Sequence, residues 1–205
     1  RHRKALTGVI VQTSAELDLP WEIMHLRPPE GQAGDGASYF LAGMGLTRWI
    51  YDTAHPTEIR IRPDRVHAVA PEYQDPVLQL PRAADEVKAL TAHVRTTPTP
   101  FGGPHDFSAV VASKFDLLHF AGHGRWHDVD PRGQQLVLAA FAPDADDGSA
   151  AYSDADARAD FPEPTQIAAD ADGPLVFLSA CDVGRLRSGA AGLGGFAEVF
   201  LRGGA

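Results

Sequence analysis

Two residue types that can do chemistry together, histidine and cysteine, stand near the ends of two apolar stretches. The first stretch, residues 117–127, carries three histidines, which are His119, His123 and His127. The second, residues 174–181, ends in Cys181, the only cysteine of the chain. Histidines at this spacing could bind a metal ion, and a histidine beside a cysteine could be the base that activates a thiol nucleophile.

The metal interpretation depends on the secondary structure around the histidines. A spacing of four residues places ligands on one face only if the segment is helical, and Gly122 and Gly124 disfavour a helix. Structural zinc sites also use more cysteine than this chain contains. We therefore expect no metal ion, and zinc binding by the three histidines stays open as an alternative.

Cys181 has two open interpretations. An unpaired cysteine is most often a small buried hydrophobe, but a cysteine placed directly after an apolar strand can also serve as a nucleophile. A thiol is mostly protonated at neutral pH, so a nucleophilic cysteine needs a neighbouring histidine. Gly124 follows His123, and its N–H, together with the N–H of Cys181, would supply the two donors that an oxyanion needs.

Two other patterns match known motifs only formally. The stretch "GLGGFA" at residues 192–197 fits G-x-G-x-x-A, but it does not directly follow a strand and no acidic residue lies about 20 residues further on. Ser179 lacks the flanking glycines of a nucleophile elbow. We expect neither dinucleotide binding nor serine catalysis.

The elements that must position these residues are strands and helices in alternation. Apolar runs and residue periodicity predict strands at residues 6–13, 65–71, 115–121, 135–141 and 174–180, and helices at 82–94, 105–113 and 192–204. The last strand is a continuous apolar run, typical of a parallel strand covered on both faces. The alternation predicts an α/β fold with helices on both sides of a mostly parallel sheet. If their strands are neighbours, His123 and Cys181 meet at the carboxyl edge of that sheet.

Composition limits the class of protein. The 205 residues are 44% hydrophobic and 22% charged, which is typical of globular folds. The net charge of -9 argues against nucleic-acid binding, and no apolar run is long enough to span a membrane. A single cysteine excludes an internal disulfide and fits the reducing cytosol. We therefore expect a cytoplasmic protein without nucleic-acid or membrane partners.

Acidic residues are concentrated between residues 144 and 172. This segment holds nine acids and one arginine, so it supplies -8 of the net charge of -9. We interpret it as an acidic, solvated loop insert. The alternative is an acidic wall near a site that receives a basic group, which gives the hypothesis of a basic residue in whatever substrate binds there.

Several stretches together resemble one known family. "FDLLHFAGHG", "PLVFLSACDVG" and "GLGGFAEVFLRGGA" are similar to the CHAT domain, a caspase-like family named for its association with tetratricopeptide repeats. The resemblance extends over roughly residues 6 to 205. Cys181 follows His123 by 58 residues, close to the separation of about 50 in caspases.

The resemblance implies a caspase–haemoglobinase-like three-layer α/β/α sandwich, formed by residues 1–205 as a single domain. It implies a cysteine endopeptidase without a cofactor, in which His123 is the base and Cys181 the nucleophile. The N–H groups of Gly124 and Cys181 would bind the oxyanion. Supporting positions are expected at Asp116, His119 and Asp182, of which the last stands where the family often has glutamate. The main alternative is a catalytically inactive domain of the same fold, used as a regulatory or protein-interaction module.

The resemblance also implies what accompanies this chain. Family members usually continue past the "GGA" at the C-terminus with a strand and a loop that help to form the substrate pocket, so we expect part of a longer polypeptide. The expected partners are a protein substrate, repeat or regulatory domains of that polypeptide, and a C-terminal subunit segment. A bacterial origin and a role in bacterial immunity are expected as well.

Overall fold

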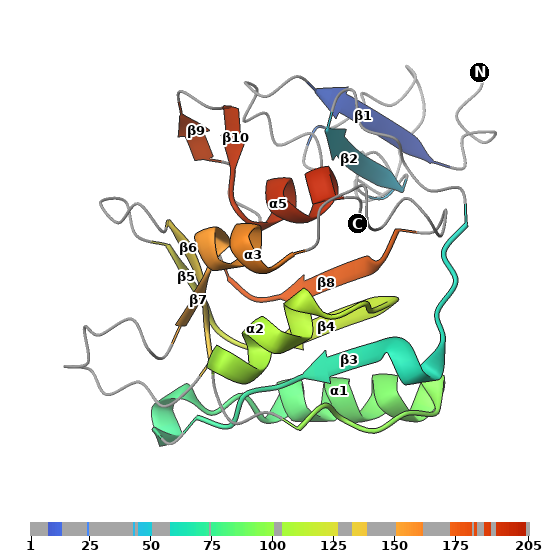
Figure 1. Cartoon of the computed structure of the whole chain (residues 1–205), viewed down its shortest axis with the longest axis vertical. Helices are drawn as coiled ribbons and strands as arrows, with labels where there is room; N and C mark the ends of the chain where they lie inside the picture. The colour runs from blue at the N-terminus through green and yellow to red at the C-terminus, as the bar shows by residue number, and fades with distance from the viewer. Residues whose placement is uncertain are drawn as a thin grey trace, which may run out of the picture. The chain divides into compact units, whose positions relative to one another are not determined.

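The computed structural model describes the larger part of the chain. The described residues are 8–13, 24, 43, 45–50, 58–73, 75–100, 104–126, 133–138, 151–161, 173–181, 183, 187–189 and 192–203. The chain divides into two compact units, residues 1–55 and residues 56–205. Figure 1 labels the strands and helices of both units.

The first unit contains a pair of parallel strands, β1 (Val9–Thr13) and β2 (Leu46–Ile50). β1 confirms the strand expected at residues 6–13, of which the structure describes 8–13. The N–H of Val9 also donates a hydrogen bond of 3.3 Å to the carbonyl of Gly45, just before β2. β1 therefore pairs with a strand that is distant in the sequence.

In the second unit, three parallel strands form the sheet that leads to the candidate residues. They are β3 (Val66–Val69), β4 (Leu117–Ala121) and β8 (Leu175–Ser179), and they confirm the strands expected at 65–71, 115–121 and 174–180. β4 lies in the middle, and its last residue, Ala121, pairs with Ser179 of β8. The strands that precede His123 and Cys181 are therefore parallel neighbours, which is the condition that the sequence left open.

Helices cover both faces of this sheet (Figure 1). On one face lies α1 (Pro81–Val94), whose Val87 packs with Ala68 of β3 and Ala121 of β4. On the other face lie α2 (Pro104–Ala112), α3 (Asp154–Asp160) and α5 (Phe196–Gly203). The expected mixed α/β fold with a parallel sheet is thus confirmed. Among the described residues, no helix has the length and apolar character needed to cross a membrane.

A separate antiparallel sheet lies beyond the arrowheads of β3 and β8 in Figure 1. It contains β5 (Gly124–Trp126), β6 (Gln134–Val137) and β7 (Ala151–Ser153), in that order. β5 directly follows His123, whose carbonyl accepts a hydrogen bond of 2.9 Å from the N–H of Val137. His123 therefore stands at the junction of the parallel and the antiparallel sheet.

The glycine-rich stretch before α5 does not form a nucleotide-binding turn. Gly192–Gly194 form β10, which pairs with β9 (Arg187–Gly189), and the helix begins only at Phe196. Gly195 joins the two with a φ of 101°, a conformation that favours glycine. The N–H of Phe196 donates a hydrogen bond of 2.8 Å to the side-chain oxygen of Gln134. The backbone N–H of the first residue of this helix is therefore already bound within the protein.

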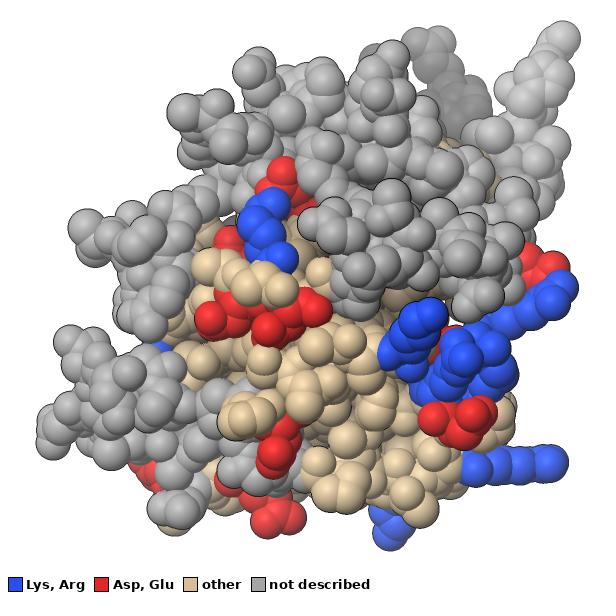
Figure 2. Space-filling view, viewed as in Figure 1, with Lys and Arg blue, Asp and Glu red and all other residues tan. Residues whose placement is uncertain are grey.

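Part of the acidic segment is folded, which corrects the interpretation of residues 144–172 as a loop. Residues 151–160 form β7 and α3. A capping box begins the helix, since the N–H of Asp156 donates to the hydroxyl of Ser153 and the N–H of Ser153 donates to the carboxylate of Asp156. Acidic side chains lie in the part of Figure 2 where Figure 1 draws α2 and α3. Acids near a helix N-terminus stabilise the helix, an effect that composition alone does not reveal.

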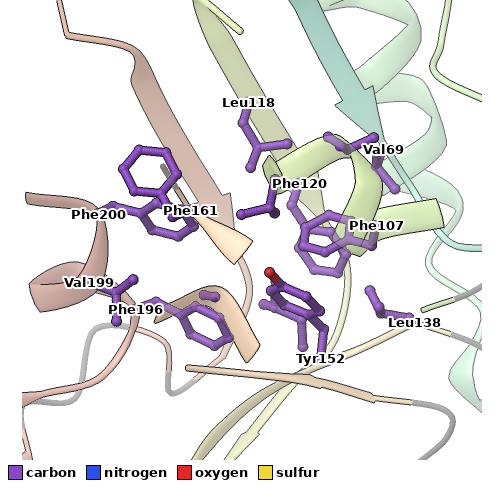
Figure 3. Packing of buried hydrophobic residues seen from close by; sticks show 14 of the residues in the cluster. Val69, Phe107, Leu118, Phe120, Leu138, Tyr152, Phe161, Phe196, Val199 and Phe200 are labelled. Atoms are coloured by element: carbon purple, nitrogen blue, oxygen red, sulfur yellow. The ribbon is translucent and has the colours of Figure 1, made fainter. Parts of the chain in front are cut away.

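The main core lies between the parallel sheet and helices α2, α3 and α5 (Figure 3). Phe107 of α2 packs edge-to-face on Phe120 of β4, with ring centroids 5.6 Å apart, and on Tyr152 of β7 at 4.9 Å. Burying one ring of this size stabilises the fold by about 1.5–3 kcal/mol. These contacts tie β4, which leads to His123, to helix α2 and to the antiparallel sheet.

β8 is less buried than its sequence predicts. Its Phe177 is 51% exposed and its Leu175 is 37% exposed, whereas Val176 and Leu178 pack against the main core. The reason is its position, because β8 is an edge strand of the sheet that the described residues form and α1 packs on β3 and β4 instead. The expectation of two covered faces is therefore wrong for this strand within the described part of the chain.

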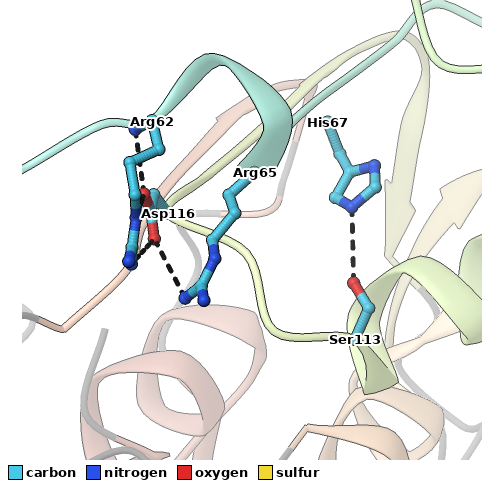
Figure 4. A network of polar contacts seen from close by, with 5 residues as sticks. All are labelled: Arg62, Arg65, His67, Ser113 and Asp116. Carbon is cyan, nitrogen blue, oxygen red and sulfur yellow. Dashed lines mark hydrogen bonds and ion pairs between the residues drawn. The ribbon is translucent and has the colours of Figure 1, made fainter. Parts of the chain in front are cut away.

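Asp116, one of the expected supporting residues, lies just before β4 and binds Arg62 (Figure 4). Its carboxylate accepts hydrogen bonds of 2.7 Å from both Nε and Nη2 of Arg62 and one of 2.9 Å from the backbone N–H of Arg62. The side-chain hydrogen bonds from Arg62 hold the pKa of Asp116 below its usual value. Asp116 is at the opposite end of β4 from His123, so it supports the start of the strand.

Replacing Asp116 with asparagine is expected to lower the free energy of unfolding by about 2 kcal/mol at neutral pH, because charge-assisted hydrogen bonds to Arg62 are lost. Folding lowers the pKa of Asp116, so its contribution is present above the ordinary value of 3.8 and disappears as the pH falls through the lowered value. Urea unfolding measured at neutral and at acid pH should show the difference between wild type and D116N shrinking in acid.

The exposed pair of Glu58 and Arg60 supplies the control for this measurement. Their charged atoms are 3.2 Å apart, but both side chains are largely in water. Glu58→Gln should therefore change the free energy of unfolding by less than about 0.5 kcal/mol. An Asp116→Asn variant as stable as wild type at neutral pH would contradict the prediction.

Candidate active site

His123 and Cys181 follow the carboxyl ends of two neighbouring strands. Ala121 of β4 pairs with Ser179 of β8, and each candidate lies two residues further along its own segment. The N–H of Gly122 donates a hydrogen bond of 3.0 Å to the carbonyl of Ser179, which continues the pairing beyond β4. The shared register therefore brings both segments to the same edge of the sheet, the arrangement that was expected if the two strands are neighbours.

Gly124 lies against the backbone of Cys181. A methyl group built on the Cα of Gly124 would overlap the carbonyl oxygen of Cys181 and would lie 3.2 Å from the Cβ of Ala180. Such a close approach of two backbones leaves no room for a side chain, so the position requires glycine. This contact joins the segment that carries the candidate base to the segment that carries the candidate nucleophile.

The imidazole of His123 is held by a backbone carbonyl. Its Nε2 lies 2.9 Å from the carbonyl oxygen of Leu78, the last residue of the short 3-10 helix η6 (Pro76–Leu78). A carbonyl oxygen can only accept, so Nε2 carries the proton in this contact. In the neutral imidazole Nδ1 is then the nitrogen that can accept a proton. The geometry therefore fits a base that works through Nδ1.

The backbone of His123 is held by Tyr73. The N–H of His123 donates a hydrogen bond of 2.8 Å to the hydroxyl of Tyr73, which in turn donates one of 3.0 Å to the carbonyl of Val137. The rings of Tyr73 and His123 also pack, with centroids 5.0 Å apart. Burial raises the pKa of Tyr73, so its hydroxyl stays protonated at neutral pH and keeps its donor.

Cys181 is exposed to solvent and is not part of a disulfide. This contradicts the alternative of a buried, inert thiol. An exposed thiol can be reached by a substrate or a reagent. The site thus combines an accessible thiol, a histidine held in one tautomer, and the backbone of Gly124 close to that of the cysteine, which is a set of groups suited to nucleophilic chemistry.

His119 is a buried residue of β4 on the face that α1 covers. Its ring stacks on Phe177 of β8, with centroids 5.0 Å apart and planes inclined by 4°. Its Nε2 lies 3.0 Å from the carboxylate of Glu86 on α1 but makes no aligned hydrogen bond within the described part of the chain. Burial lowers the pKa of His119, and the negative charge of Glu86 opposes this. The residue packs between strands and helix, as expected for a strand position.

The remaining candidates, His127 and Asp182, lie outside the described residues. Across the positions that the structure does describe, no three or more His, Cys, Asp or Glu side chains are grouped so that they could hold a metal ion. His119 belongs to a strand that ends at Ala121, so the helix that would place residues four apart on one face is not formed here. The described residues therefore give the zinc alternative no support.

Two contributors to the site were missed by sequence reasoning. Leu78 acts through its backbone carbonyl, and a backbone atom leaves no signal in the residue type. Tyr73 lies 50 residues before His123, in a proline-containing segment without the periodicity of a strand or helix. The only sequence signal there is the pair of prolines, Pro71 and Pro76, which indicates an ordered turn and no function.

A comparison of the sequence with models of known protein families gives a match. The model of the CHAT domain matches residues 4–205 of the chain. No curated protein and no solved structure matches it. The matched range includes His123, Gly124 and Cys181, so the geometry described above lies inside the matched domain.

Proposed function

The chain belongs to the CHAT domain family, which is related to caspase-like proteases, and from this premise we propose that it is a cysteine endopeptidase that cleaves a protein substrate. The observation that carries the proposal is the packing of Gly124 on the carbonyl of Cys181, at the shared edge of β4 and β8. Helices on both faces of the parallel sheet support, as the complete fold, a three-layer α/β/α sandwich of the caspase–haemoglobinase type.

In the proposed mechanism, Nδ1 of His123 takes the proton from Sγ of Cys181, and the thiolate attacks the carbonyl carbon of the scissile peptide bond. The electron pair of that carbonyl moves to its oxygen, where the N–H groups of Gly124 and Cys181 stabilise the negative charge. The C–N bond then breaks as the imidazolium gives its proton to the leaving amine. Water, deprotonated by His123, hydrolyses the remaining thioester and restores the thiol.

The carbonyl of Leu78 keeps the ring of His123 oriented throughout the proton transfers. Its hydrogen bond to Nε2 of His123 is retained when the ring becomes an imidazolium, and a bond to a charged donor is stronger than one to a neutral donor. The carbonyl also prevents the ring from presenting Nε2 to the thiol.

Three acids of the acidic segment have roles within the fold. This limits which acids could recognise a basic residue of the substrate. Asp156 caps α3, and Asp154 is buried. Asp160 accepts hydrogen bonds of 2.5 Å from Ser108 and 2.9 Å from Tyr152. The charges of these three acids serve the fold, so the proposed preference for a basic residue before the cleaved bond depends on acids outside the described residues.

Digestion of a diverse peptide library tests the proposed function. We expect cuts at defined sequence positions, and we expect them to disappear in Cys181→Ala, which lacks the nucleophile. Ser179→Ala is the matched control, because it removes a small polar group two residues before Cys181, at the end of β8, and should cut like wild type. A preference for aspartate before the cleaved bond would contradict the hypothesis of a basic residue.

Two results together would contradict the proposed peptidase activity. The first is a peptide library that stays uncut, and the second is a Cys181 that reacts with a peptide electrophile no faster than free cysteine does. That pair of results would favour the alternative, a catalytically inactive domain that acts as a regulatory or protein-interaction module. Binding partners, and not cleavage products, would then be the readout of function.

A further inference from the structure

The hydroxyl of Tyr73 is buried between two backbone segments, residues 122–123 and residue 137. It accepts from the N–H of His123 and donates to the carbonyl of Val137. A methyl group built on Gly122 would lie only 2.7 Å from the same oxygen, so the backbone before His123 also passes close to it. A buried hydroxyl is retained where it pairs polar groups that would otherwise be unsatisfied, and this one pairs two.

The same residue helps to form the turn that holds the imidazole. The backbone carbonyl of Tyr73 accepts a hydrogen bond from the side-chain amide of Gln79. Between these two residues, Asp75 caps η6, because its carboxylate accepts a hydrogen bond of 2.8 Å from the N–H of Val77. The turn closed in this way ends at Leu78, whose carbonyl binds Nε2 of His123. The backbone contact and the ring contact to His123 therefore come from one short segment.

We propose that Tyr73 is a positioning residue whose hydroxyl fixes both the location and the tautomer of His123. The proposal rests on the proposed function, in which Nδ1 of His123 receives the thiol proton. Without the hydroxyl, the N–H of His123 and the carbonyl of Val137 lose their common partner, and the backbone of His123 must shift to find another. A shift of the backbone moves the ring away from the Leu78 carbonyl, and Nε2 then no longer holds the proton exclusively.

Tyr73→Phe removes this oxygen and keeps the packed ring, and Tyr152→Phe is the matched control. Both tyrosines are 2% exposed, and the hydroxyl of Tyr152 also donates a hydrogen bond of 2.9 Å to the carboxylate of Asp160. A merely structural role would make the two variants alike. The first readout is the nitrogen NMR spectrum of the histidine rings, in which the His123 signals are assigned with a His123→Gln variant. The second is the alkylation of Cys181 by a peptide electrophile.

We expect wild type and Y152F to show His123 with the proton on Nε2, and Y73F to show a mixture of tautomers. The maximal alkylation rate of Y73F should fall about 10- to 100-fold, with the half-saturating concentration changed by less than about twofold. His123 signals in Y73F identical to those of wild type would overturn the proposal. Wild-type alkylation no faster than that of free cysteine would overturn the proposed function instead, and the ring spectrum would still decide the role of Tyr73.

Discussion

Replacing His123 with alanine is expected to slow the alkylation of Cys181 by a peptide electrophile about 100- to 10,000-fold near neutral pH, because the general base is removed. The carbonyl of Leu78 holds the imidazole with its proton on Nε2, which leaves Nδ1 to accept the thiol proton. Cys181 is the only cysteine of the chain, so the mass of the alkylated protein reports on this thiol alone. The rate is measured over a series of reagent concentrations.

His67→Ala is the matched control for that experiment. His67 is also a partly buried histidine, with Nε2 3.3 Å from the hydroxyl of Ser113 (Figure 4) and Nδ1 3.4 Å from that of Thr99. It lies on β3 and has no part in the proposed chemistry, so the variant should react like wild type. If H123A and wild type react equally, both at the rate of free cysteine, the His123–Cys181 pair is not a catalytic dyad and the interaction module is favoured.

Gly124→Ala is expected to lower kcat/KM for a cleaved peptide about 100- to 1,000-fold, the loss found when an oxyanion donor is displaced. The added methyl group would overlap the carbonyl oxygen of Cys181, and because that oxygen belongs to the backbone it cannot turn aside, so the two segments must separate. The N–H of residue 124 then moves away from the position in which it would bind the oxyanion. Steady-state kinetics measures the loss, and the thermal unfolding midpoint checks that the variant is folded.

The control for this variant is Gly8→Ala, at the residue just before β1. A methyl group there would lie 3.5 Å from the carbonyl oxygen of Gly45, which is an ordinary contact. The same substitution should therefore leave kcat/KM unchanged. Wild-type activity in G124A would show that the backbone of residue 124 is not required beside Cys181 and would count against the proposed oxyanion site.

The strands of the parallel sheet could be predicted because their sequences are strongly biased. β4 and β8 are apolar runs that end in glycine or in Ser-Ala-Cys, and such runs are typical of strands in a parallel sheet. The exposure of Phe177 could not be predicted, because it depends on which strand lies at the edge of the sheet. Residue composition describes how apolar a strand is and not how many neighbours it has.

The interpretation of residues 144–172 as a loop was wrong at helix α3, and for a different reason. Its acidic composition suggests a solvated loop, yet the pair Ser153 and Asp156 begins a helix through reciprocal side-chain hydrogen bonds. The Ser-x-x-Asp spacing is a short sequence signal that could have indicated this helix. The net charge of the surrounding segment masked it, because charge is an average over many residues and a cap is a contact between two.

The sequence by itself determined which residues have the chemistry of the candidate site and the order in which they occur. Residue type makes Cys181 and His123 the candidate nucleophile and base, and the apolar runs before them place both after strands. Only the tertiary structure decided that those strands are parallel neighbours, that Gly124 touches the carbonyl of Cys181, and that Tyr73 and Leu78 hold His123. These contacts join backbone atoms from segments far apart in the chain, and no local residue pattern encodes which of them will meet.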